Sequence, residues 1–122
     1  MIGIELIEEE RIRQVNEEGW TDRHDDQYYN GELTDAGDAY LKYYNAGSGT
    51  KMPRFWPWEE SWWKPSEDPC RNLVKAGALY KADVDRLNRI AVHYEYDTQE
   101  WLNAQIKIIA QMLDKLNKND TL

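Results

Sequence analysis

The side chains best suited to chemistry are tryptophans that gather in one short segment. Four of the six tryptophans lie close together, at Trp56, Trp58, Trp62 and Trp63. Tryptophan combines a flat apolar ring with a polar N–H and is common on binding surfaces. Cations flank the cluster at Arg54, Lys64, Arg71 and Lys75. A stacking surface beside cations is what a planar, anionic ligand requires, although the same tryptophans could instead close the end of a bundle as a small core.

A second group of polar and aromatic residues follows Gly19. It consists of Trp20, His24, Asp25 and Asp26. Adjacent His and Asp can bind a metal or act as an acid–base pair, and the alternative is a loop in which the carboxylates accept from backbone amides. No two histidines have metal-ligand spacing, so we expect no metal site and no cofactor. Arg11 and Arg13 precede this group and would help to neutralise a phosphate.

The acidic residues near the start of the chain contain one enzymatic pattern. Glu5-x-x-Glu8 and Glu32-x-x-Asp35 resemble the paired carboxylates of MazG-type nucleotide pyrophosphohydrolases, all-α enzymes that hold Mg²⁺ against phosphates. The alternative is that these are solvated acidic faces, because twelve of the first 38 residues are acidic.

Periodicity predicts an all-α fold of about four helices, over residues 3–18, 32–46, 70–94 and 98–117. The expected apolar stripes are Ile4, Ile7, Arg11 and Val15 in the first helix, Leu33, Ala36, Tyr40, Leu41 and Tyr44 in the second, and Leu73, Gly77, Tyr80, Val84, Leu87 and Ala91 in the third. Residues 19–26 are expected to form an ordered loop. Residues 47–69 contain all four prolines and form a long, ordered Trp/Pro-rich loop. Asp68-Pro69 predicts the cap and first residue of the third helix.

The last helix carries a heptad seam. Its positions are Leu102, Ile106, Ile109, Leu113 and Leu116, and Trp101, Ile108 and Met112 widen the apolar face. Either this helix closes its own bundle, or it also pairs with a second copy. We therefore divide the chain into a helical ligand-binding part, 1–96, and an amphipathic helix, 97–122, for packing or homo-oligomerisation.

Composition narrows the class of protein. The chain has 122 residues, enough for one domain, and a formal net charge of −8. Such a charge disfavours nucleic acid and anionic membrane surfaces as partners. No apolar run approaches the roughly 20 residues that span a bilayer, the acidic start is unlike a signal peptide, and one cysteine cannot form an internal disulfide. We expect a cytoplasmic protein.

The motifs together resemble a family of small proteins from tailed phages and prophages. The matching residues are Glu10-Arg11-x-Arg13-Gln14, Glu18-Gly19-Trp20-Thr21-x-x-His24-Asp25-Asp26, Gly31-Glu32-Leu33, Trp56-Pro57-Trp58, Trp62-Trp63-Lys64-Pro65, Leu73-Val74-Lys75-Ala76-Gly77-Ala78-Leu79 and Asp85-Arg86-Leu87. A looser similarity is to the ryanodine-receptor repeat domain, through Arg11-Ile12, Gly19-Trp20 and Asp25-Asp26, although Thr21-Asp22 replaces its usual tyrosine-glycine. Prokaryotic members of that class are associated with nucleotide-derived ligands in conflict systems. The resemblance implies a protein of the bacterial host cytoplasm.

These observations favour a phage binding protein, rather than an enzyme, that sequesters or senses a nucleotide-derived signal and so counters host defence. The expected ligand-binding residues are Arg11, Arg13, Trp20, His24, Asp25, Asp26, Arg54, Trp56, Trp58, Trp62, Trp63, Lys64, Arg71 and Lys75. The alternatives are the Mg²⁺-dependent pyrophosphohydrolase and a protein-binding inhibitor of a host factor that docks through its tryptophan surface.

Overall fold

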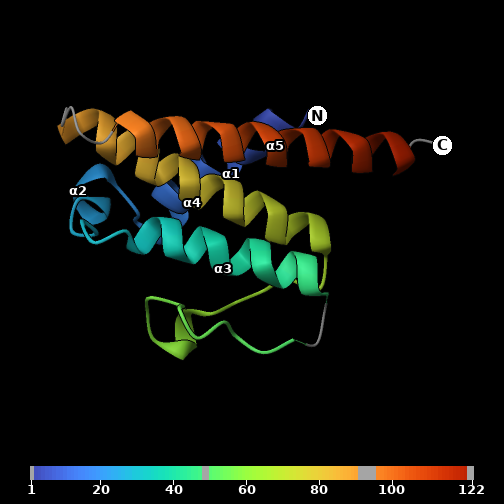
Figure 1. The fold of residues 1–122 in the computed structure, drawn as a ribbon, viewed down its shortest axis with the longest axis horizontal. Helices are drawn as coiled ribbons and strands as arrows, with labels where there is room; N and C mark the ends of the chain where they lie inside the picture. The colour runs from blue at the N-terminus through green and yellow to red at the C-terminus, as the bar shows by residue number, and fades with distance from the viewer. Residues whose placement is uncertain (1, 48–49, 91–95, 121–122) are drawn as a thin grey trace.

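The computed structural model describes residues 2–47, 50–90 and 96–120, and the part of the chain that it describes is all-α, as predicted (Figure 1). The helices are α1 (Gly3–Glu18), α2 (Asp22–Asp25), α3 (Glu32–Ala46), α4 (Pro69–Ile90) and α5 (Tyr96–Asp120), with a short 3₁₀ turn, η1 (Glu60–Trp62). The four long helices match the predicted ones closely. The third was expected to reach residue 94, and residues 91–95 lie outside the described part.

Helix α4 is the centre of the bundle. It packs against α3 on one side and α5 on the other, and α1 and α2 also contact it (Figure 1). Its predicted stripe is buried at Leu73, Gly77, Tyr80, Val84 and Leu87, and Ala91 lies outside the described residues. At its start, the Asp68 carboxylate accepts a hydrogen bond from the Cys70 amide at 3.0 Å. The Asp-Pro signal therefore sets the beginning of the helix as expected.

Glycines let two helices approach α4 closely. A Cβ on Gly77 would lie 2.8 Å from Cδ1 of Ile7 on α1, and a Cβ on Gly37 of α3 would lie 2.7 Å from the Tyr80 ring. Neither distance is compatible with ordinary van der Waals contact. Glycine at these positions therefore allows α1 and α3 to pack closely against α4.

The buried face of α1 differs from the predicted stripe. Ile7 is fully buried, but Ile4 is exposed and Val15 is only partly buried. Polar side chains take the rest of the buried face: Glu10, Arg11 and Gln14. The helix therefore packs on an apolar contact near its start and turns a polar face inward near its end.

The heptad seam of α5 is used within the chain. Leu102, Ile106, Ile109 and Leu113 are buried in the core, and Leu116 packs against it. Trp101 and Ile108 remain about half exposed. The seam thus closes this bundle, and pairing with a second copy stays a prediction. No helix in the described part is both long enough and apolar enough to cross a membrane.

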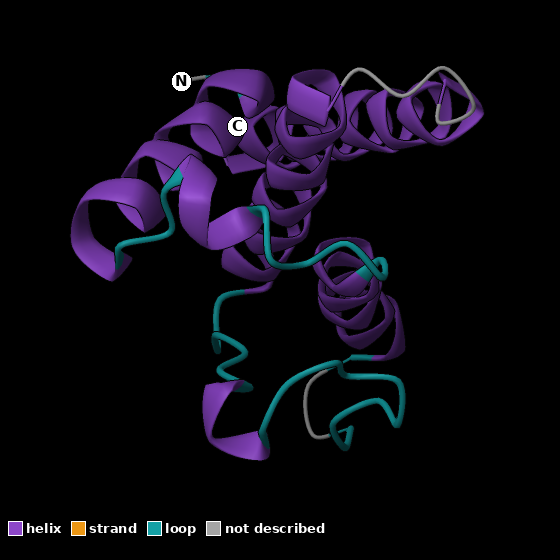
Figure 2. Cartoon of the chain, turned by 90° about the vertical axis from the view of Figure 1, so that its left-hand side faces the viewer, coloured by secondary structure: helices purple, strands orange, loops and turns teal. Residues whose placement is uncertain are grey.

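Residues 50–68, which precede α4, are held in place although they are mostly irregular (Figure 2). The Lys64 amide donates to the Tyr40 hydroxyl at 3.3 Å, which fixes the segment to α3. The Asn72 side chain of α4 binds both backbone groups of Ser66, at 2.7 and 2.9 Å. Side chains from this segment consequently form a stable wall beside the bundle.

Candidate ligand-binding site

Two adjacent cavities lie where the Trp/Pro-rich segment meets the helices. The first, called the cationic cavity, has a volume of about 300 Å³ and is lined by Arg13, Gln14, Glu18, Trp20, Tyr40, Trp62, Lys64, Lys75 and Leu79. The second, called the aromatic cavity, has a volume of about 420 Å³ and is lined by Trp20, His24, Tyr28, Pro57, Trp58, Glu59 and Trp62. Trp20 and Trp62 line both. A ligand could therefore extend from one cavity into the other past the same two indole rings.

Gly19 and α2 bring the aromatic wall together. Gly19 ends α1 in the left-handed region, at a φ of 74°, which turns the chain so that Trp20 leaves the helix at the cavities. Residues 22–25, expected as loop, form the short helix α2, in which Thr21 caps the His24 amide. The His24 ring stacks on Trp20 with 5.8 Å between ring centroids. The two rings are nearly parallel, and both line the aromatic cavity.

The four clustered tryptophans divide into two pairs. Trp56 is 8 % exposed and belongs to the core, where it contacts Tyr40 and Trp63. Trp58 and Trp62 line the aromatic cavity, and Trp62 is 55 % exposed. The first pair, Trp56 and Trp63, anchors the segment against Tyr40 of α3, and the second lines the aromatic cavity.

Lys75 of α4 is a partly buried cation of the cationic cavity. Its ammonium donates to the Lys64 carbonyl at 2.6 Å and lies 5.5 Å from the Tyr40 ring centroid. Burial lowers the pKa of Lys75, and the neighbouring Arg71 lowers it further. Lys64 itself is exposed at the cavity wall. The ammonium group of Lys75 is therefore only partly hydrated.

Arg13 and Arg71 share one buried carboxylate, that of Glu10. Arg71 contacts a Glu10 oxygen at 2.6 Å, and the Arg13 guanidinium pairs with the other oxygen. Arg13 also contacts Glu18 at 3.1 Å. The hydrogen bond with Glu10 raises the pKa of Arg13 above its already high ordinary value. Both arginines are thus fixed in position, with much of their charge balanced inside the protein.

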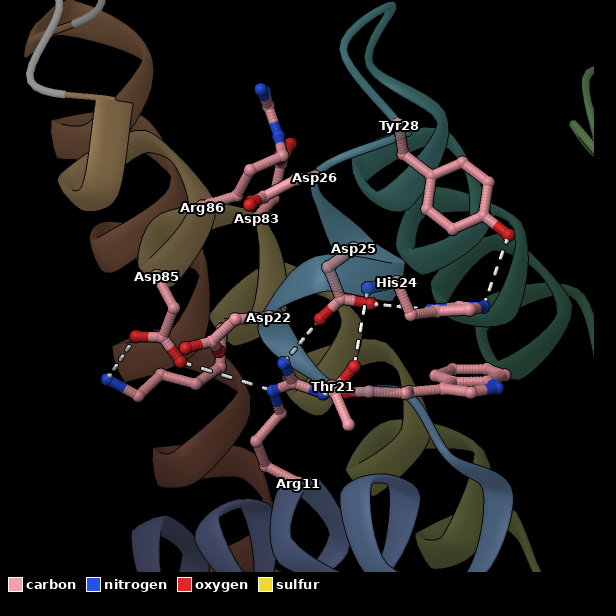
Figure 3. A network of polar contacts seen from close by, with 12 residues as sticks. Arg11, Thr21, Asp22, His24, Asp25, Asp26, Tyr28, Asp83, Asp85 and Arg86 are labelled. Atoms are coloured by element: carbon pink, nitrogen blue, oxygen red, sulfur yellow. Dashed lines mark hydrogen bonds and ion pairs between the residues drawn. The ribbon is translucent and has the colours of Figure 1, made fainter.

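Arg11 and Asp25 are buried and line neither cavity, and Figure 3 shows their side chains pointing toward each other. They form an ion pair, and Arg11 also donates to the Trp20 carbonyl at 3.2 Å. The other Asp25 oxygen lies 3.0 Å from His24 Nδ1. The other ring nitrogen, Nε2, lies 3.5 Å from the Tyr28 hydroxyl, so the imidazole is held between Asp25 and Tyr28. The pair thus positions Trp20 and His24, which line the aromatic cavity.

Seven of the fourteen expected residues line neither cavity: Arg11, Asp25, Asp26, Arg54, Trp56, Trp63 and Arg71. Asp26 pairs with Arg89 at 2.6 Å and joins α2 to the end of α4. Arg54 lines a third cavity, of about 380 Å³, which it shares with Lys42, Lys51 and Phe55. The sequence thus placed Arg54 near the tryptophans, but the structure gives it different neighbours. The expected residues that do converge on the first two cavities are Arg13, Trp20, His24, Trp58, Trp62, Lys64 and Lys75.

Sequence reasoning did not select Gln14, Tyr28 or Tyr40 as site residues. Gln14 is 3 % exposed, and its side-chain oxygen has no hydrogen-bond partner within the described residues. The buried Trp58 Nε1 likewise has none in the same part of the chain. The sequence could have predicted that Gln14 is buried, because it follows Ile7 by seven residues and therefore lies on the same face of the helix.

The carboxylates of the pyrophosphohydrolase pattern do not form a metal site. Glu5 and Glu8 are exposed on α1, whereas Glu32 and Asp35 belong to the first turn of α3. Among the residues that the structure describes, no group of three or more His, Cys, Asp or Glu side chains is arranged to hold a metal ion. The arrangement thus lacks the carboxylate cluster that this alternative needs.

Comparison of the chain with protein-family models, with curated proteins and with solved structures finds no match.

Proposed function

We propose that this protein binds a nucleotide-derived small molecule and thereby sequesters or senses it. The phosphate would lie in the cationic cavity and the base against Trp20 and Trp62, which line both cavities. The observation that carries the proposal is Lys75, a half-buried cation beside two arginines at the wall of a cavity walled elsewhere by tryptophan. The resemblance to phage proteins favours a signal of a bacterial defence system as the ligand.

The electrostatics of the cationic cavity favour an anion. Burial and the adjacent Arg71 both disfavour the charged form of Lys75, so a negative group placed beside it relieves an existing cost. Lys64 can supply a second ammonium from the exposed rim. Hydrogen bonds between a cation and phosphate are worth about 1.5–3 kcal/mol each. Glu18, which also lines this cavity, is paired with Arg13 and opposes the anion less than a free carboxylate would.

The aromatic residues suit the other half of such a ligand. Stacking a base on an aromatic side chain contributes about 1–3 kcal/mol. Trp62 is exposed and can take a ring on its face, while the stacked His24 ring covers one face of Trp20 and holds that indole in place. The volume of each cavity lies in the range typical of small-molecule sites.

Isothermal titration calorimetry with linear and cyclic nucleotides tests the proposal. We expect at least one of them to bind at a single site, and Lys75→Met to weaken that binding by about ten- to hundredfold, as loss of one charge-assisted hydrogen bond requires. The matched control is Lys115→Met, since Lys115 is exposed on α5 and lines neither cavity.

A second pair of variants tests the stacking wall. Trp62→Ala should weaken binding, whereas Trp101→Ala should not, although Trp101 is also about half exposed. Equal affinities of the wild type and both cavity variants, Lys75→Met and Trp62→Ala, would place the ligand elsewhere. Absence of binding by every nucleotide would contradict the proposed function.

A further inference from the structure

The third cavity, which Arg54 lines, gathers cations without a balancing carboxylate. Its volume is about 380 Å³, its charged lining residues are Lys42, Lys51 and Arg54, and no aspartate or glutamate is among the described residues that line it. None of the three cations forms an ion pair within the described part of the chain, and the Lys42 ammonium lies 5.5 Å from the centroid of the Phe55 ring. The wall of this cavity therefore carries positive charge that no lining side chain neutralises.

In a protein of this composition such a group of cations needs an explanation. Acidic residues outnumber arginines and lysines by 23 to 15, and the formal net charge is −8. Many of the cations accordingly pair with carboxylates: Arg11, Arg13, Arg71, Lys81, Arg86 and Arg89. Most of the described cations without an ion pair line either the cationic cavity or the third cavity, and those that do not are Arg23, Lys107 and Lys115.

The end of helix α3, which reaches the third cavity, does not account for these charges. The C-terminus of a helix carries the equivalent of about half a negative elementary charge, which is far less than three cations supply. Asp38, one turn before Lys42 on the same helix, accepts a hydrogen bond from the Tyr80 hydroxyl instead. Most of the positive charge at the cavity is therefore available to a ligand.

The other lining residues strengthen the attraction for an anion. Pro53 is buried, Met52 packs against the core, and Phe55 adds an aromatic ring, so part of the wall is apolar. A hollow that is lined by charge of one sign and has apolar walls concentrates ions of the opposite sign, because the surrounding medium screens the field less than water does. The cavity volume also lies in the range of small-molecule sites.

The number of cations indicates the kind of anion. A single phosphate monoester carries about 1.5 to 2 negative charges at pH 7, which leaves part of the charge of Lys42, Lys51 and Arg54 unbalanced. A diphosphate group has one phosphate more and can balance all three. The planar guanidinium of Arg54 can bind two oxygens of one phosphate, and the two ammonium groups can bind the other oxygens as point charges.

We propose that the third cavity is a second anion site, separate from the cationic cavity, which binds the diphosphate group of a small molecule. This inference does not rest on the proposed function, because the residues that line the third cavity differ from those that line the first two.

Isothermal titration calorimetry with inorganic pyrophosphate, in a phosphate-free buffer, tests the proposal. Pyrophosphate should bind the wild type at least tenfold more tightly than orthophosphate does. Lys51→Met and Arg54→Met should each weaken pyrophosphate binding by about tenfold, because each removes one charge-assisted contact. Both side chains are exposed, so the circular dichroism of the variants should match that of the wild type. The matched controls are Lys107→Met and Arg23→Met, since both residues are exposed and line none of the three cavities.

Two further titrations separate the third cavity from the cationic cavity. Pyrophosphate should bind Lys75→Met with an Arg54-dependent affinity equal to that of the wild type, and nucleotide binding should be the same for Arg54→Met and the wild type. Loss of pyrophosphate binding in Lys75→Met, with none in Arg54→Met, overturns the inference because it places the anion in the cationic cavity. Weaker nucleotide binding by Arg54→Met also overturns it, since one ligand would then occupy both cavities.

The remaining outcomes are equally decisive. Absence of pyrophosphate binding by the wild type, or equal affinities of the wild type, Lys51→Met and Arg54→Met, overturns the inference, while the nucleotide titrations decide the proposed function independently. Isopentenyl diphosphate distinguishes two sources of the diphosphate group. Tighter binding than pyrophosphate that is lost in Phe55→Ala supports a diphosphate ester as the occupant, and weaker binding supports free pyrophosphate.

Discussion

Breaking the ion pair between Arg11 and Asp25 should destabilise the site strongly, because either residue left alone would be a buried, unpaired charge. The Asp25 side chain is fully buried and that of Arg11 is 9 % exposed. Removing one partner of a buried pair leaves an uncompensated charge and typically costs about 3–5 kcal/mol. We expect the lower end, about 3 kcal/mol, for Asp25→Asn, because Arg11 keeps its bond to the Trp20 carbonyl and lies 4.0 Å from Asp85.

Urea unfolding followed by helical circular dichroism at neutral pH measures this cost. Tryptophan fluorescence is unsuitable, since Trp20 belongs to the perturbed network. Taking an m value of about 1.5–2 kcal/mol/M, a loss of 3 kcal/mol lowers the midpoint by about 1.5–2 M urea. Arg11→Met should cost a similar amount, and the double variant Arg11→Met/Asp25→Leu should be much more stable than the sum of the single effects implies.

The same variant should also impair binding, since Asp25 holds His24 through Nδ1 and Arg11 holds the backbone of Trp20. A midpoint shift below about 0.5 M would refute the reasoning, since it would mean that the pair is solvated rather than buried. Additive effects in the double variant would refute it too, because two coupled charges cannot act independently at this distance.

Two further predictions concern the scaffold. Gly77→Ala should destabilise the fold by about 1–3 kcal/mol, because the new Cβ would lie 2.8 Å from Ile7 Cδ1; thermal unfolding should show partial recovery when Ile7→Val is added, and no recovery would mean that α1 approaches α4 elsewhere. Burial raises the pKa of Asp38, against the opposing hydrogen bond from Tyr80, so the folded state holds this proton more tightly than the unfolded state and loses stability as pH rises through the raised pKa. Asp38→Asn should therefore be more stable than wild type at pH 7, with the advantage vanishing in acid below the ordinary carboxylate range; an advantage that persists unchanged at low pH would contradict this assignment.

The helices were predictable because their apolar residues recur with the helical period. Leu73, Tyr80 and Leu87 lie one heptad apart on α4 and are all buried. The same method gave only part of the buried face of α1: Ile7 and Arg11 are buried as expected, but Ile4 is exposed, and the buried Glu10 and Gln14 were not expected. A polar residue is buried only when partners far away in the sequence surround it. Arg71 binds Glu10 across 61 residues of chain, and no local pattern contains that information.

The sequence predicted which types of side chain line the cavities, but not which individual residues do so. Trp56 and Trp58 are two residues apart and have the same chemistry, yet one is core and the other lines a cavity. Their difference depends on where α3 lies, which periodicity does not give. Arg11 and Asp25 were selected for their charge, and it is their pairing with each other that turns both of them inward.

Native mass spectrometry of the protein with the nucleotide panel tests the central claim most directly. The account predicts that the wild type retains one nucleotide of intact mass per chain, that Lys75→Met loses it, and that Lys115→Met keeps it. A wild-type protein that stays ligand-free with every nucleotide, or a Lys75→Met variant that retains as much nucleotide as the wild type, would contradict the claim.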